Sequence, residues 1–130
     1  MRTIKIYCRE CEVELTSELT EIPETDLRWE ENEDIMAENN FSIFMNPHTN
    51  KKSLLAANAD YNLKKHPDLN RFFGCCGSDG SNGLNRLCIN NHEVATEVSD
   101  CWTAHYIEFD KDQIIVKEKI SNEISEELKL

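Results

Sequence analysis

The chain has 130 residues, of which 25 are Asp or Glu and 14 are Lys or Arg, so its formal net charge is -11. This length is typical of one domain, and we expect residues 1–130 to fold as a single unit. The negative charge argues against a nucleic-acid partner, because nucleic-acid surfaces need clustered Lys and Arg. No run approaches the roughly 18 apolar residues of a membrane span, and no secretory signal stands at the start. The sequence therefore predicts a cytoplasmic protein without a membrane partner.

The negative charge is concentrated in the first third of the chain. Residues 12–38 contain eleven acidic residues and a single basic residue, Arg28, whereas residues 48–72 contain five basic and two acidic residues. A solvated face that prevents self-association explains such an acidic segment. The alternative is an acidic surface that docks on a basic partner protein.

The first predicted element is a strand. Residues 2–7 alternate apolar and polar side chains and run into Cys8, and the alternation resumes at 13–15 beyond a tight turn. A helix is predicted next, over 26–38, because Thr25 can cap it and acidic side chains fill its first turn. Its apolar stripe is thin, so we expect this helix to be mostly exposed.

The remaining elements are short. Residues 41–44 form an apolar run that predicts a strand, while 54–57 are apolar without a clear period and fit either a strand or a helix. All four glycines lie between positions 74 and 83, which predicts an irregular loop. Residues 106–109 and 113–117 predict a hairpin. The last nine residues, 122–130, fit a short helix or a frayed tail. The prediction is an α+β fold with short antiparallel strands and loops gathered around the cysteines and one or two peripheral helices.

The cysteines carry the clearest chemical signal. Six are present, and zinc ligation, disulfides and reactive thiols are the three explanations that compete: Cys8, Cys11, Cys75, Cys76, Cys88 and Cys101. A C-x2-C pair after a strand lets both thiolates turn toward one ion, and four Cys or His ligands complete a zinc tetrahedron. Disulfides need an oxidising compartment, for which the sequence gives no sign. The sequence therefore favours a structural zinc ion.

The ligands of that zinc are only partly determined by the sequence. Cys8 and Cys11 form the first pair, and Cys88 is the expected third ligand. One of the adjacent cysteines at 75 and 76 is the preferred fourth ligand, and His92, in a C-x3-H spacing with Cys88, is the alternative. Cys101, beside Trp102, is interpreted as a buried core residue in preference to a nucleophile activated by the histidine four residues later.

Three segments of the chain resemble known proteins: Gly74-Cys75-Cys76-Gly77, Asn85-Arg86-Leu87-Cys88, and Glu93-Val94-Ala95-Thr96-Glu97-Val98-Ser99-Asp100-Cys101-Trp102. Through them the chain resembles a poorly characterised family of small bacterial zinc-ribbon-like proteins, whose cysteines it shares in part. The resemblance implies a zinc-binding domain and no particular activity. Asn91 occupies the position where a common ribbon turn has its second cysteine.

A zinc ion with four protein ligands has no open position for a substrate or water, so the sequence favours a non-enzymatic protein. We expect a protein-interaction module that presents its acidic face to another protein. One alternative is an immunity or inhibitor protein against a basic enzyme, since such inhibitors complement the charge of their targets. The other is a small metalloenzyme or thiol redox protein that uses an incomplete metal site or Cys101.

Overall fold

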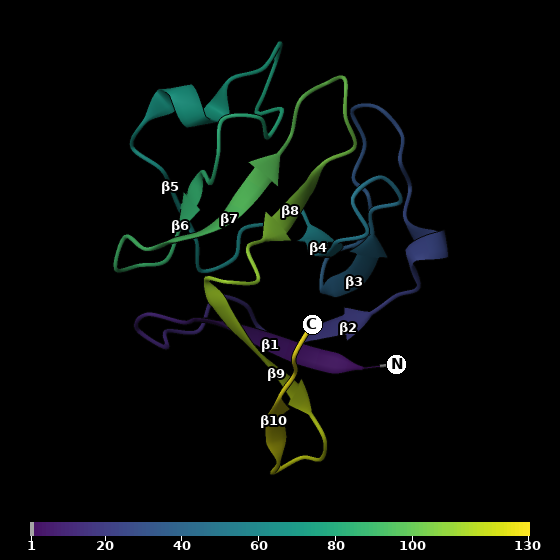
Figure 1. The fold of residues 1–130 in the computed structure, drawn as a ribbon, viewed down its shortest axis with the longest axis vertical. Helices are drawn as coiled ribbons and strands as arrows, with labels where there is room; N and C mark the ends of the chain where they lie inside the picture. Colours follow the sequence, from purple (N-terminus) through teal and green to yellow (C-terminus); the bar gives the residue numbers. More distant parts are fainter. Residues whose placement is uncertain (1) are drawn as a thin grey trace.

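The structure, a computed structural model, describes residues 2–130, and its regular secondary structure is almost entirely strand. Ten strands join in one sheet in the order β10-β9-β1-β2-β3-β4-β8-β7-β6-β5 (Figure 1). Neighbouring strands are antiparallel except β2 and β3, which are parallel, so the sheet is mixed. The strands are β1 (Thr3–Cys8), β2 (Leu19–Glu21), β3 (Asn40–Met45), β4 (Lys52–Ala57), β5 (Lys64–Lys65), β6 (Arg86–Leu87), β7 (Glu93–Val98), β8 (Tyr106–Phe109), β9 (Ile114–Lys119) and β10 (Ser125–Glu127).

The predicted α+β fold with peripheral helices is wrong. Within residues 2–130 the helical structure consists of two short 3-10 helices, η1 (Glu24–Asp26) and η2 (Leu69–Phe72). The C-terminal segment, predicted as a helix or a tail, contains β10, which pairs with β9 over three residue pairs. Hydrogen bonds to β9 pair the backbone groups of this segment, whereas a short isolated helix is only marginally stable in water.

Residues 27–38 form an irregular segment in place of the predicted helix. The backbone N–H of Asn32 donates to the Thr103 carbonyl at 2.8 Å, and the N–H of Ile35 donates to the His105 carbonyl at 3.0 Å. A helix here would place many carboxylates near one another and bury only a narrow apolar stripe. Pairing with a neighbouring loop satisfies the backbone and still buries Ile35 completely.

β4 explains why residues 54–57 show no clear period. Leu54 and Ala56 belong to the main core, whereas Leu55 and Ala57 belong to a second cluster on the opposite face of the strand. A strand covered on both faces has no polar positions to alternate with its apolar ones. The second cluster also contains Ile35, so it anchors the acidic segment to the sheet.

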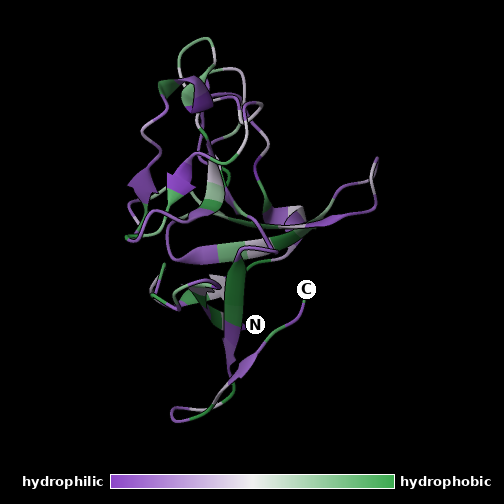
Figure 2. Cartoon of the chain, turned by 60° about the vertical axis from the view of Figure 1, so that its left-hand side comes forward, coloured by the Kyte–Doolittle hydropathy of each residue, from purple (hydrophilic) through white to green (hydrophobic). Residues whose placement is uncertain are grey.

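The sheet curls, and the curl brings distant strand ends together. In the strand order, β1 and β6 are separated by five other strands: β2, β3, β4, β8 and β7. One core cluster nevertheless contains side chains from both ends of this series. Figure 2 shows hydrophobic residues along the central strands and hydrophilic ones in β10. The buried members of the cluster include Ile4, Ile6, Phe41, Leu54, Val94, Ile107, Phe109, Ile114 and Val116. Full burial of each such side chain contributes about 1.5–3 kcal/mol, so the core holds the C-terminal ends of β1 and β6 in contact.

Candidate metal centre

The turn after β1 presents two cysteines to the same side. Cys8 ends the strand, and its N–H donates to the Val13 carbonyl at 2.9 Å while its carbonyl accepts from the Glu12 N–H at 2.8 Å. Glu12 has φ 59°, the left-handed conformation that reverses the chain within a few residues. This tight turn places Cys11 opposite Cys8, as the C-x2-C spacing predicts.

The turn between β6 and β7 has a similar construction. The N–H of Cys88 donates to the His92 carbonyl at 2.9 Å, and the carbonyl of Cys88 accepts from the Asn91 N–H at 2.9 Å. Asn91 has φ 72°, the counterpart of the left-handed residue in the first turn. The N–H groups of Asn90 and His92 lie 3.3 and 3.4 Å from the Cys88 sulfur and donate to it. Two backbone donors thus hold the Cys88 sulfur in place within the turn.

The two turns together bring four ligand atoms to one point. The Sγ atoms of Cys8, Cys11 and Cys88 and a ring nitrogen of His92 all lie within 4.8 Å of one another, and we call these residues the four-ligand cluster. Cys11 Sγ is 3.8 Å from Cys88 Sγ. The Nδ1 of His92 is 3.6 Å from the Cys8 sulfur and 3.3 Å from the Cys88 sulfur.

These separations match a tetrahedral zinc site. Zinc–sulfur bonds of about 2.3 Å imply a sulfur–sulfur edge of about 3.8 Å, and a zinc–nitrogen bond of about 2.0–2.1 Å implies a sulfur–nitrogen edge of about 3.5 Å. Cys8 and Cys88 are buried, and Cys11 and His92 are partly buried. The cluster can therefore hold one metal ion with four protein ligands, in a place shielded from bulk water.

The two thiols of the first turn differ in acidity. Burial raises the pKa of Cys8 to about 11, against the opposing effect of backbone N–H donors. A hydrogen bond from the Asn90 side chain, aided by the Val13 backbone, lowers the pKa of Cys11 to about 6. In the metal-free protein at neutral pH Cys11 is thus a thiolate and Cys8 a thiol, and a metal ion that binds here displaces the Cys8 proton.

The structure brings together three of the five proposed metal residues. Cys8, Cys11 and Cys88 lie in the four-ligand cluster, and the alternative ligand His92 lies there as well. Cys75 and Cys76 lie elsewhere, so the structure supports the C-x3-H pair over the adjacent cysteines. The C-x3-H spacing of Cys88 and His92 is the feature of the sequence that indicated His92 as an alternative ligand.

Cys75 and Cys76 belong to a second group, which we call the three-cysteine cluster. Cys76 forms a disulfide with Cys101, 25 residues away, and Cys75 is a free, exposed thiol. Cys101 is therefore not a core residue, and its neighbour Trp102 is 65% exposed. The sequence reasoning missed this grouping because the two segments meet only through packing of the glycine-rich loop on the turn between β7 and β8.

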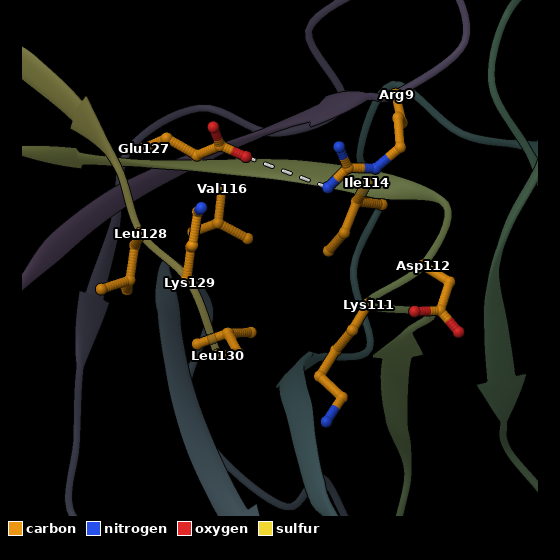
Figure 3. A pocket seen from close by; sticks show the side chains of 9 residues that line it. All are labelled: Arg9, Lys111, Asp112, Ile114, Val116, Glu127, Leu128, Lys129 and Leu130. Carbon is orange, nitrogen blue, oxygen red and sulfur yellow. Dashed lines mark ion pairs between the residues drawn. The ribbon is translucent and has the colours of Figure 1, made fainter.

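A surface cavity with a volume of about 460 Å³ lies beside β9 and β10 (Figure 3). Charged and aliphatic side chains line it, and in the described part of the chain its lining contains no cysteine, histidine or hydroxyl residue. Its carboxylate at Glu127 pairs with Arg9 at 3.9 Å. This cavity therefore lacks the sulfur and imidazole ligands that a zinc-class ion prefers.

Comparison with protein-family models, with curated proteins and with solved structures gives no match for this chain. The resemblance to zinc-ribbon-like proteins thus stays an expectation from the sequence, and the metal centre is supported by its geometry. Within residues 2–130, no helix is long and apolar enough to cross a membrane.

Proposed function

We propose that this chain is a non-enzymatic protein whose fold is held by one structural zinc ion in the four-ligand cluster. The observation that carries the proposal is the tetrahedral spacing of four protein ligands from two turns far apart in the sequence. Four protein ligands leave no position for water or substrate, which is the arrangement of structural zinc sites. Three thiolates and one imidazole also suit zinc better than hard cations, which prefer oxygen.

We further propose that the protein acts as an interaction module through its acidic segment. Seven acidic side chains between positions 24 and 38 are exposed: Glu24, Asp26, Glu30, Glu31, Glu33, Asp34 and Glu38. A hydrogen bond and the nearby charge of Glu30 raise the pKa of Glu33, so two like charges lie side by side at the surface. Such a concentration of negative charge favours a basic partner and speeds the encounter with it.

An exposed tryptophan within this segment gives the surface an anchor. Trp29 is 49% exposed, and its ring lies 4.9 Å from the ring of Phe44 and 5.9 Å from that of Tyr106. These aromatic rings and Glu108 line a surface pocket of about 430 Å³. Aromatic faces beside carboxylates bind Lys and Arg side chains, and tryptophan is enriched among the residues that dominate binding energy. The partner that fits is a protein with an exposed basic surface.

The test is a comparison of two charge-reversal variants as bait for partner proteins. The first replaces four acids of the segment by Lys: Glu30, Glu31, Glu33 and Asp34. The matched control replaces four exposed acids elsewhere: Asp60, Asp112, Glu123 and Glu126. The first variant and Trp29→Ala should lose partners that wild type and control retain, and added salt should weaken those complexes. Equal retention by all four proteins would refute the acidic-face proposal and leave the zinc proposal intact.

A further inference from the structure

The three-cysteine cluster has one more sulfur than a disulfide requires. The Sγ atoms of Cys75, Cys76 and Cys101 all lie within 4.8 Å of one another. Two of them form the disulfide, and the third is a free thiol at the surface. Three sulfurs at this spacing, once reduced, can reach a single soft metal ion.

Backbone packing, independent of the disulfide, holds these sulfurs near one another. Gly77 lies so close to Ser99 that a side chain on the glycine would overlap the Ser99 carbonyl oxygen. The Ser99 N–H donates to the Ser78 carbonyl at 2.8 Å. The Cys76 N–H donates to Oδ1 of Asp100 at 3.1 Å. Reduction of the disulfide therefore leaves the two loops docked and their sulfurs close.

Asp100 supplies an oxygen at the same place. It is only 4% exposed, and its Oδ1 lies 3.3 Å from the Cys76 sulfur. A sulfur and a carboxylate oxygen bound to one zinc ion are roughly 3.6 Å apart, by the bond lengths of about 2.3 and 2.1 Å. The Cys101 N–H, 3.1 Å from the Cys76 sulfur, adds a donor that stabilises a thiolate. The surroundings thus suit a negatively charged sulfur and a bound cation.

We propose that the three-cysteine cluster is a redox-gated site for a thiophilic cation of the zinc class, bound by Cys75, Cys76, Cys101 and the Asp100 carboxylate. In the oxidised protein the disulfide occupies two of the sulfurs and excludes the metal. Two molecules of a small thiol reduce it: the protein sulfurs gain two electrons and two protons, and the small thiols become a disulfide. A divalent cation then displaces the protons of the three thiols, and three protons enter solution.

This site is distinct from the four-ligand cluster, whose thiols are all free in the same structure. The two sites therefore respond differently to oxidation: the four-ligand cluster keeps its metal, whereas the three-cysteine cluster gains or loses metal with the state of its disulfide. The sulfurs are close to the surface, where both a small thiol and a metal ion have access.

The test measures bound zinc per chain on the full-length protein, once after mild oxidation and once after reduction with a phosphine, with unbound metal removed. The oxidised wild type should retain about one zinc and the reduced wild type about two. Cys75→Ser keeps the disulfide pair and should bind about one zinc in both states. In the reduced wild type, sulfur-to-cadmium charge-transfer absorption should rise with the first and again with the second equivalent of Cd²⁺, whereas in Cys75→Ser it should stop rising after the first.

Three outcomes would overturn the proposal: no additional zinc after reduction, a second zinc that is already present in the oxidised protein, and a second zinc that survives Cys75→Ser. The Cys75 side chain is exposed, so its replacement leaves the core intact and the test stays decisive. Loss of the first zinc through Cys8→Ser, with the redox-dependent second zinc retained, would separate this site from the structural one.

Discussion

Removal of metal from the four-ligand cluster should destabilise the fold by about 4 kcal/mol. A cross-link between Cys11 and Cys88 spans 77 residues, and closing a loop of that size removes about 4.5 kcal/mol of chain entropy from the unfolded state. Free zinc at about a thousand times the dissociation constant gives a similar figure of about 4.1 kcal/mol. For a chain of this size the melting temperature should fall by roughly 10–20 °C.

Urea unfolding of the oxidised protein, with zinc and with a chelator, measures this difference. Cys11→Ser should lower the midpoint and lose its response to zinc. Cys75→Ser is the matched control, because it removes an exposed thiol outside the cluster, and its midpoint should be that of wild type. The reasoning is refuted if the chelator leaves the midpoint of wild type unchanged, or if the control variant loses as much stability as Cys11→Ser.

Three further predictions concern the core, the second turn and the thiols. Phe109→Ala should lower the free energy of unfolding by about 3–5 kcal/mol, because the ring is only 1% exposed. Leu69→Ala, at an 82% exposed position, should change that free energy by less than about 0.5 kcal/mol. Equal losses in urea unfolding would contradict the assigned core. Asn91→Gly should retain zinc affinity, whereas Asn91→Val should weaken it by about tenfold or more, because a β-branched residue is strained at φ 72°. Titration against a competing chelator measures both affinities. Equal affinities would contradict the role of this left-handed residue in the zinc-binding turn. In the metal-free protein, iodoacetamide should alkylate Cys11 with a midpoint near pH 6 and should alkylate Cys8 slowly below pH 10, because their pKa values are about 6 and about 11. Faster alkylation of Cys8 than of Cys11 would show that the assigned environments are wrong.

The pKa values of Cys8 and Cys11 also determine how the stability of the metal-free protein changes with pH. The folded-state pKa of Cys11 lies below its ordinary value of 9.0, so in the metal-free protein its contribution to stability is present above pH 9 and is lost as pH falls through about 6. The folded-state pKa of Cys8 lies above 9.0, so its contribution is present below pH 9 and is lost as pH rises through about 11. Acid also releases zinc, because protons compete with the metal for its ligands.

Local features of this chain could be predicted from its sequence. The pairing of Cys8 with Cys11 follows from a strand that ends at the first cysteine and a turn of four residues, both encoded by neighbouring positions. The strand β1 follows from period-two alternation in the same way, and so do the separate strands β8 and β9. The hairpin predicted from 106–109 and 113–117 is wrong, because β8 pairs with β4 and β7 whereas β9 pairs with β1 and β10. The glycine-rich loop after η2 follows from composition.

Features that depend on contacts between distant parts of the chain could not be predicted from the sequence. The preferred fourth ligand was a cysteine at 75 or 76, and only the curl of the sheet determines that His92 reaches the first turn instead. The helix predicted over 26–38 fails because the backbone of a loop near His105 offers that segment hydrogen bonds, and local propensity does not include them. The parallel pairing of β2 with β3 is likewise a tertiary feature.

The most direct test of the metal centre is zinc K-edge X-ray absorption on the Cys75→Ser protein, which leaves the four-ligand cluster as the zinc site. The account predicts about one zinc per chain with three sulfurs at about 2.3 Å and one nitrogen at about 2.0–2.1 Å. A shell of four sulfurs, a shell with a water oxygen in place of the imidazole, or a protein purified without zinc would contradict it.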